Sequence, residues 1–312
     1  MEKRKPKIKA TRDTFVHYLF ASPGHEPLLL SFINAVLGNA GRPLVRHVEA
    51  KNPFNPQTFV LDKHTVLDVR ATDENGKIFA IEFQTAPHLS FANRILYYWS
   101  RTYSTQLGEG ERYRELCPVI SIALVGFLLF EELEKLHNVF HITAEDAPEY
   151  ILTEDFQLHS LELVAPKISQ LPLLKEPLRC WLTFFYYADK KTEAQMKVLL
   201  KKDASVERAY DKYKRFCQDE RLRAVDEAHQ RYLHDYNSDV DGAMEKGLAQ
   251  GRVEGVLEGR ILTLLSFLQR HFGRLPKRLM DRIGKLTDQE QIEELTFHVP
   301  NCRTLKEFAD SF

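Results

Sequence analysis

The chain has 312 residues, of which 44% are hydrophobic and 28% are charged, and its formal net charge is −1. That length is enough for one core domain with an accessory region, and the balanced charge excludes a strongly basic protein that coats nucleic acid. The four cysteines lack Cys-x-x-Cys spacing, and the longest apolar run, 119–130, is too short to span a bilayer. We therefore expect no zinc site, no membrane partner and a soluble cytoplasmic protein.

The first part of the chain reads as a basic arm followed by alternating helical and strand patterns. Residues 1–12 carry most of their charge as lysine and arginine, which suits either a mobile arm that touches phosphates or a solubilising tail. Hydrophobic periodicity then predicts an α/β core, a mixed sheet flanked by helices. The predicted helices are 13–20, 25–38 and 90–107, and the predicted strands are 44–50, 59–72, 77–85, 118–125, 138–143 and 156–163.

A β-hairpin is predicted around the turn sequence at 73–77 (DENGK). This sequence admits two loops whose registers differ by one residue. A two-residue Asn-Gly loop puts Asp68 and Glu82 on opposite faces of the sheet. A three-residue loop, with Gly76 in the left-handed conformation, puts Asp68 directly across from Glu82.

In the three-residue register the hairpin has one polar and one apolar face. The apolar face carries Leu67, Val69, Ala71, Phe79, Ile81 and Phe83 and is expected to pack on a core. The polar face carries Asp68, Arg70, Thr72, Ala80, Glu82 and Gln84 and is expected to line a cleft. Two adjacent carboxylates repel each other unless a cation or a shared proton neutralises them, and oxygen ligands suit Mg²⁺ or Mn²⁺. A solvated, non-functional face is the alternative.

The predicted helix after the hairpin brings Arg94, Tyr98 and Arg101 onto one face, because they are spaced by four and three residues. This face can grip the phosphates of a DNA strand through its arginines. Packing of the tyrosine and surface pairing of the arginines is the alternative. Trp99 and Tyr97 point elsewhere and are expected to pack in the interior.

The second part of the chain is predicted to be helical from about residue 177. Glycines recur every fourth residue at 247, 251, 255 and 259, which makes a lone helix marginal and favours a helical linker that self-associates over a flexible spacer. A small helical domain follows, with a turn at Gly273 and Pro276 and an N-cap at Asp288. We divide the chain into an arm (1–12), the α/β core (13–175), a helical extension (176–240), the glycine-repeat linker (241–260) and the C-terminal domain (261–312).

Several segments in this order resemble the PD-(D/E)XK nuclease superfamily, and within it the recombination-promoting nuclease and putative transposase branch. They are RDTFVHYLFASPGHEPLLLSFINAVLG, LDVRATDENGKIFAIEFQ, RILYYWSRTYSTQLGEGERY, PVISIALVGF and FQLHSLELVAPK. The resemblance covers nearly all of residues 11–170 and implies a restriction-endonuclease-like fold. The C-terminal helices resemble the short domain that often follows such nuclease domains, for which domain exchange or oligomerisation is expected.

The resemblance also implies roles for individual residues. Asp68, Glu82 and the backbone carbonyl of Phe83 are expected to bind Mg²⁺ or Mn²⁺, and Gln84 takes the place of the superfamily's lysine. Asp13 and His17 are accessory candidates, the latter where the family usually has lysine; an ordinary buried helix residue is the alternative for His17.

The expected function is a metal-dependent DNA endonuclease linked to recombination or transposition. A nuclease-fold protein that binds DNA or assembles without turnover is the alternative, since neither superfamily lysine is present. A third possibility is that the C-terminal helices form a homo-oligomer that restrains the nuclease.

Overall fold

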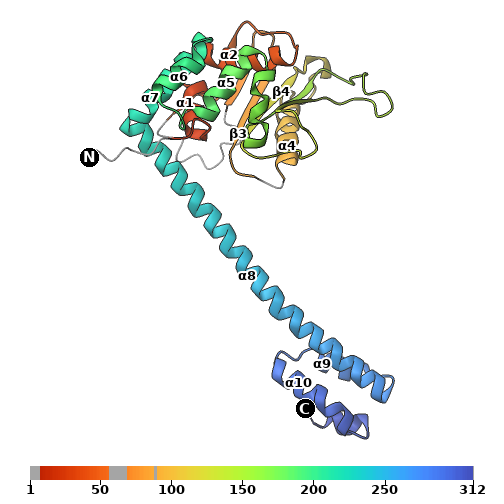
Figure 1. Ribbon diagram of the computed structural model, residues 1–312. Helices are drawn as coiled ribbons and strands as arrows, with labels where there is room; N and C mark the ends of the chain where they lie inside the picture. Colours follow the sequence, from red (N-terminus) through yellow and green to blue (C-terminus); the bar gives the residue numbers. More distant parts are fainter. Residues whose placement is uncertain (1–7, 56–68, 88–89, 312) are drawn as a thin grey trace, which may run out of the picture. The chain divides into compact units, whose positions relative to one another are not determined.

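The computed structural model describes residues 8–55, 69–87 and 90–311 (Figure 1). The chain divides into two compact units, Met1–Gln230 and Arg231–Phe312, and each is considered by itself.

The first unit is built on a mixed sheet, as the sequence predicts. In the described part of the chain it has six strands in the order β1-β2-β3-β4-β6-β5. They are β1 (Val48–Ala50), β2 (Val69–Asp73), β3 (Ile78–Gln84), β4 (Val119–Val125), β5 (His137–Phe140) and β6 (Phe156–Glu162). β3, β4 and β6 run parallel to one another, whereas β1, β2 and β5 are antiparallel to their neighbours. All residues of β4 are buried, which is the pattern of a central strand covered on both faces.

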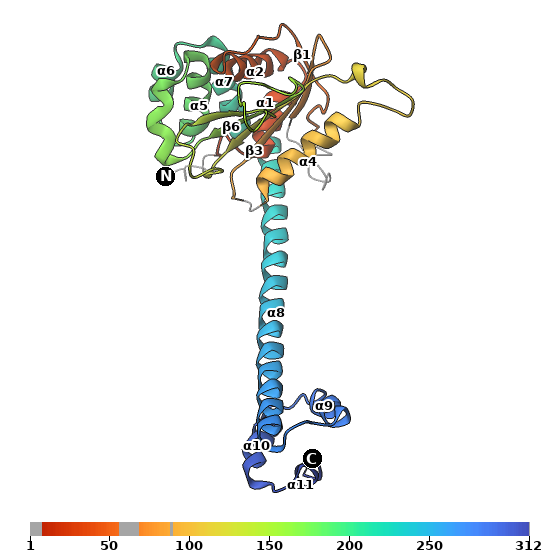
Figure 2. The same ribbon diagram turned by 90° about the vertical axis from the view of Figure 1, so that its right-hand side faces the viewer.

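Helices cover both faces of this sheet (Figures 1 and 2). The helices in the described part of this unit are α1 (Asp13–Ala21), α2 (Glu26–Asn39), α4 (Phe91–Ser104), α5 (Glu176–Tyr187), α6 (Glu193–Leu200), α7 (Ala204–Gln218) and the start of α8 (Glu220–Phe272). Short 3₁₀ segments, η1 (Tyr113–Glu115) and η2 (Ala165–Leu173), join other elements. α4 packs on one face through Phe91 and Ile95, which contact Ala123 and Val125 of β4.

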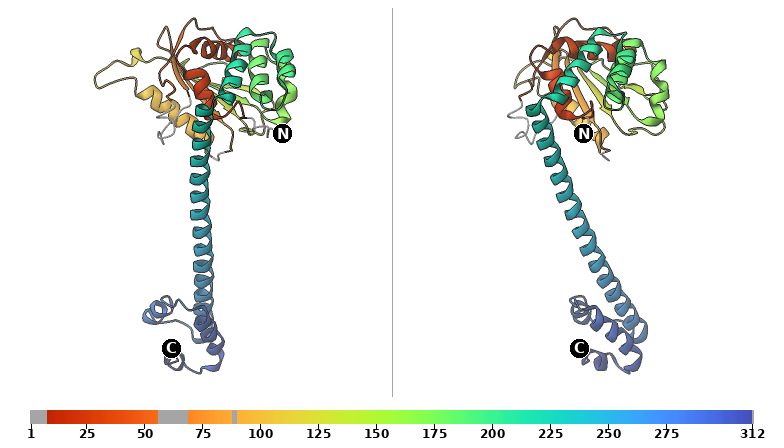
Figure 3. Two further views of the ribbon diagram at one scale, coloured as in Figure 1. Left: turned by 90° about the vertical axis from the view of Figure 1, so that its left-hand side faces the viewer. Right: turned by 60° about the vertical axis from the view of Figure 1, so that its left-hand side comes forward.

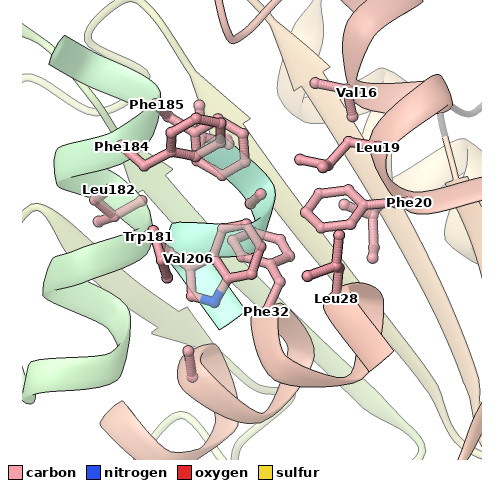
Figure 4. Packing of buried hydrophobic residues seen from close by; sticks show 14 of the residues in the cluster. Val16, Leu19, Phe20, Leu28, Phe32, Trp181, Leu182, Phe184, Phe185 and Val206 are labelled. Atoms are coloured by element: carbon pink, nitrogen blue, oxygen red, sulfur yellow. The ribbon is translucent and has the colours of Figure 1, made fainter. Parts of the chain in front are cut away.

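The main core lies on the opposite face, between the sheet and α1, α2, α5 and α7. Figure 4 shows Phe20 of α1 and Phe32 of α2 facing Trp181 and Phe185 of α5. The Phe20 and Phe32 rings stack with centroids 5.1 Å apart, and Phe83 of β3 joins them from the sheet at 6.0 Å from Phe32. Large, fully buried aromatic side chains of this kind supply much of the hydrophobic stabilisation of a domain. This packing fixes β3 against the helices and so determines which of its faces is left for α4.

A directional chain of hydrogen bonds runs between α2 and the β5–β6 edge of the sheet. Asn39 accepts from the amide of Lys175 at 2.9 Å, so its side-chain NH₂ donates to Nδ1 of His137 at 2.7 Å. Nε2–H of His137 then donates to Nδ1 of His159 at 3.0 Å. Burial lowers the pKa of His137 to about 4 and that of His159 to about 3. Both rings are therefore neutral parts of the interior at neutral pH.

A buried ion pair lies at the end of β6. Nζ of Lys167 donates to Oε2 of Glu162 at 2.8 Å, and the side chains are 6% and 0% exposed. The same carboxylate oxygen accepts from the amide of Leu129 at 3.1 Å. The pair thereby ties the segment that follows β4 to the segment that follows β6.

The second unit is helical. It consists of most of α8, the helices α9 (Lys277–Ile283), α10 (Gln289–His298) and α11 (Leu305–Ala309), and the 3₁₀ turn η3 (Val299–Asn301) (Figure 3). Its core gathers Leu264 and Leu268 of α8 with Ile292 and Phe308. Among the residues with described placement, no helix combines the length and apolar character needed to cross a membrane.

The predicted helix boundaries of this unit are confirmed. Gly273 takes a positive φ of 78° after α8, and Pro276 is the N-cap of α9. Oδ1 of Asp288 accepts from the amides of Glu290 and Gln291 at the start of α10.

Candidate metal centre

The hairpin β2–β3 adopts the three-residue loop, so the two-residue alternative is wrong. The amide of Gly76 donates to the carbonyl of Asp73 at 3.2 Å, and the amide of Asp73 donates to the carbonyl of Lys77 at 3.0 Å. Gly76 has φ 81°, in the left-handed region that favours glycine. Oδ1 of Asp73 closes the turn by accepting from the amides of Asn75 and Lys77 at 2.9 and 2.8 Å. This loop sets the pairing of the strands, from Thr72 with Ile78 to Val69 with Ile81.

The register gives the hairpin the two faces that the sequence predicts. Its apolar face joins the main core through Val69, Ala71, Phe79, Ile81 and Phe83. Its other face carries Arg70, Thr72, Ala80, Glu82 and Gln84. That face is more enclosed than a cleft-lining surface, because α4 lies over it and leaves Glu82 only 8% exposed.

Asp68 lies outside the described residues, and its part in the site is not placed by the structure. Phe83 has a buried side chain, so the contribution expected of it would come from its backbone carbonyl. Of the other predicted residues, the structure brings Glu82 and Gln84 together with Arg94.

Arg94 of α4 is the nearest partner of the two β3 side chains. Its Nη2 donates to Oε1 of Glu82 and, at 2.9 Å, to Oε1 of Gln84. The orientation of the Gln84 amide is fixed, since its Nε2 donates to the carbonyl of Ala86 at 3.1 Å. The guanidinium also lies 5.0 Å from the centre of the Phe91 ring. The site therefore presents two side-chain oxygens that converge on one cationic nitrogen.

The pKa of Glu82 is raised, chiefly because burial disfavours its charged form. The Arg94 guanidinium opposes this shift through its charge and its hydrogen bond, and the negative charge of Asp13 adds to it. Asp13, whose Oδ2 lies 3.6 Å from Nε2 of His229, is thus close enough to Glu82 to repel it through space. A second cation would relieve the repulsion between these carboxylates.

His17, one turn after Asp13 on α1, is a buried residue with 5% exposure. Oδ1 of Asn52 accepts from the amide of Arg70 at 2.8 Å, so its NH₂ donates to Nε2 of His17 at 3.2 Å. Asn52 was not singled out from the sequence, and it ties α1 to the start of β2. No periodicity or spacing marks a loop asparagine for such a role.

The expected DNA-binding face of α4 has mixed exposure. Tyr98 is half-buried and Arg101 is exposed, whereas Arg94 turns towards the sheet. Trp99 packs as predicted, with Nε1 donating to the carbonyl of Val119 at 2.9 Å. The same prediction for Tyr97 is wrong, because 58% of that residue is exposed.

The oxygen atoms on this face of the hairpin are the kind of ligand that suits a hard divalent cation. Glu82 and Gln84 offer oxygen atoms, as Mg²⁺ and Mn²⁺ require, and a buried carboxylate needs a positive charge beside it. Within the described ranges, no three histidine, cysteine or acidic residues lie together so as to hold a metal ion. The described oxygens thus fit such an ion but make up only part of a coordination shell.

Comparison with known proteins matches most of the chain to a family model. The family model described as PD-(D/E)XK nuclease family transposase matches residues 11–243. No curated protein and no solved structure matches the chain.

Proposed function

Because the chain belongs to the PD-(D/E)XK nuclease family transposases, we propose that it is a metal-dependent endonuclease that hydrolyses phosphodiester bonds in DNA. The observation that carries this proposal is the buried carboxylate of Glu82, which shares a sheet face with Gln84 and is repelled by Asp13. Arg94 supplies one positive charge to this arrangement, and a divalent cation would balance the negative charge that remains.

In this proposal Asp68, Glu82 and the carbonyl of Phe83 hold Mg²⁺ or Mn²⁺. The bound ion would polarise a phosphoryl oxygen and lower the pKa of water. Gln84 orients water or a phosphate oxygen through its amide and, unlike a lysine, adds no positive charge. Asp13 strengthens the site's attraction for the ion by its charge, while His17 supports the adjoining wall through Asn52.

DNA is proposed to approach along α4. Arg101 is exposed and suited to phosphate oxygens, and half-buried Tyr98 lies on the same face. The basic arm at 1–12 would add sequence-independent contacts to the strand. A role in recombination or transposition is proposed on the family description alone.

The second candidate function is a DNA-binding or assembly protein that uses this fold without cutting. Two observations favour it: glutamine occupies position 84, and Arg94 already neutralises Glu82. The two candidates differ in turnover, so a cleavage assay separates them.

Nicking of supercoiled plasmid, measured with Mg²⁺ and with EDTA, tests the proposal. We expect nicking by the wild-type protein with Mg²⁺, and its loss in Glu82→Gln and in Asp68→Asn. Glu109→Gln, at an exposed position, is the charge-matched control and should cut normally. DNA binding without metal-dependent nicking in the wild type would refute the endonuclease and support the second candidate.

We also propose that α8 forms a homo-oligomer with a second copy of the chain. Val240, Met244 and Leu248 recur at every fourth residue and are 48–63% exposed. Four glycines of the same helix, Gly247, Gly251, Gly255 and Gly259, also recur at every fourth residue. A Cβ added at any of them would meet no described atom within 4 Å, so a second helix could approach the backbone closely at these glycines. Light scattering should show an oligomer that Met244→Glu/Leu248→Glu dissociates. A monomeric wild-type protein would refute this.

A further inference from the structure

Arg94 occupies the position in which a cation is needed. One nitrogen, Nη2, contacts both Oε1 of Glu82 and Oε1 of Gln84. The proposed function gives the Glu82 carboxylate to the metal ion and the Gln84 amide to a water or phosphate oxygen beside that ion. The guanidinium and a divalent ion would therefore compete for the carboxylate of Glu82. Both cations held together beside Glu82 would repel each other strongly in a site that is largely shielded from water.

We propose that Arg94 is a resident counter-ion of the metal-free site, which the incoming divalent ion displaces and thereby frees to bind a phosphate of the DNA strand. This inference rests on the proposed function, since it presumes a metal at Glu82. It assigns Arg94 two successive partners, Glu82 and then DNA, where the sequence suggested either DNA contact or surface pairing.

The contacts of Arg94 are those of a side chain that is held but replaceable. A guanidinium has five N–H donors and binds a carboxylate most strongly through two parallel hydrogen bonds. Here Nη2 serves both Glu82 and Gln84, and Nε is buried without a hydrogen-bond partner among the described residues. A buried donor that lacks a partner weakens the resting arrangement. Moving the guanidinium away would let that N–H find water or a phosphate oxygen.

From its position on α4, the Arg94 side chain could reach the proposed DNA-binding surface once it has left Glu82. It lies in the first turn of the helix, and its side chain is 27% exposed, so it already borders solvent. Tyr98 and Arg101 follow on the same face. A guanidinium that leaves Glu82 thus joins the surface proposed to receive DNA, and its planar fork suits phosphate oxygens. Metal binding would in this way prepare the substrate-binding surface.

Calorimetric titration with Mn²⁺ at pH 8, without DNA, tests displacement independently of activity. Arg94→Met removes the competing charge while keeping an unbranched side chain over Phe91, so we expect Mn²⁺ to bind at least about tenfold more tightly than to wild type. Arg112→Met removes one positive charge at an exposed position and should leave the affinity unchanged. Equal or weaker Mn²⁺ binding by Arg94→Met would overturn the inference.

A second measurement uses only the wild-type protein, in case the variant does not fold. Phenylglyoxal modifies accessible arginines, and mass spectrometry of the peptide that contains Arg94 gives its rate of modification. We expect Mn²⁺ to accelerate modification of Arg94 severalfold and to leave Arg112 unaffected. An unchanged or slower rate at Arg94 would overturn the inference.

The outcomes separate this inference from the function on which it rests. Metal-dependent nicking together with unaltered Mn²⁺ affinity in Arg94→Met would overturn only the role of Arg94. Absence of Mn²⁺ binding in both proteins would overturn the metal site and, with it, the displacement.

Discussion

Replacing Gly76 by alanine should test whether the hairpin turn has the conformation that sets the register of the site. Gly76 has φ 81°, and an L-residue in the left-handed region costs about 1–2 kcal/mol. A Cβ at this position would also lie 2.9 Å from Sγ of Cys117, closer than such contacts normally allow. Sγ is the end of a half-buried side chain, so turning it aside adds only about 1 kcal/mol. We expect Gly76→Ala to lower the free energy of unfolding by about 2–3 kcal/mol in total.

Two further variants separate the conformational part of this loss from the steric part. Gly24 has φ 80°, and a Cβ there would meet nothing within 4 Å, so Gly24→Ala should cost only the conformational part, about 1–2 kcal/mol. In a Cys117→Ala background the clash at Gly76 disappears, because the remaining Cβ of residue 117 lies 3.9 Å away. Gly76→Ala should then cost about as much as Gly24→Ala.

Urea unfolding followed by tryptophan fluorescence measures these differences. The two tryptophans of the chain, Trp99 and Trp181, both lie in the first unit, so their emission reports on the unit that contains the hairpin. A cost for Gly76→Ala no greater than that for Gly24→Ala, with no recovery in the Cys117→Ala background, would refute the turn geometry and the register derived from it.

Three further predictions concern buried polar groups and a helix cap. In the folded chain the pKa values of His137 and His159 are about 4 and about 3, below the value of about 6.5 in an unfolded chain. The unfolded state therefore takes up more protons below pH 6.5, and stability should fall as the pH drops from 6.5 towards 4, by about 2 kcal/mol per histidine at pH 5. His159→Phe should flatten this slope in urea titrations, and stability that stays constant between pH 7 and pH 5 would contradict the reasoning. Lys167→Met should lower the free energy of unfolding by about 3–5 kcal/mol, since it leaves buried Glu162 without its cation. Adding Glu162→Leu should recover part of that loss, and a double variant as unstable as Lys167→Met alone would contradict the proposed ion pairing. Asp288→Ala should destabilise the second unit by about 1 kcal/mol through loss of the α10 cap, seen as faster amide exchange in α10 but not in α5.

The sequence predicts most of the elements of the fold because their patterns are local. The all-apolar run at 119–125 identifies a central strand, and alternation in β3 identifies the face that joins the main core. The turn sequence at 73–77 narrows the hairpin to two registers but does not choose between them, because asparagine and glycine suit both loops. The conformation of Gly76 makes that choice.

The site is less predictable than the fold because its contacts join elements that are distant in sequence. Periodicity places Arg94 correctly on a face with Tyr98, yet it does not show that α4 crosses the sheet where Arg94 meets Glu82. The same limitation explains Tyr97, whose aromatic character suggests burial although its side of α4 faces solvent. Asn52 depends on the folded positions of His17 and Arg70, which no local pattern encodes.

Anomalous diffraction from crystals soaked in Mn²⁺ would test the central claim, a divalent ion bound at Glu82, most directly. We predict an anomalous peak about 2 Å from the carboxylate of Glu82, with the Arg94 guanidinium withdrawn from that carboxylate. Crystals that take up Mn²⁺ elsewhere, or not at all, while Arg94 stays bonded to Glu82 would contradict the claim.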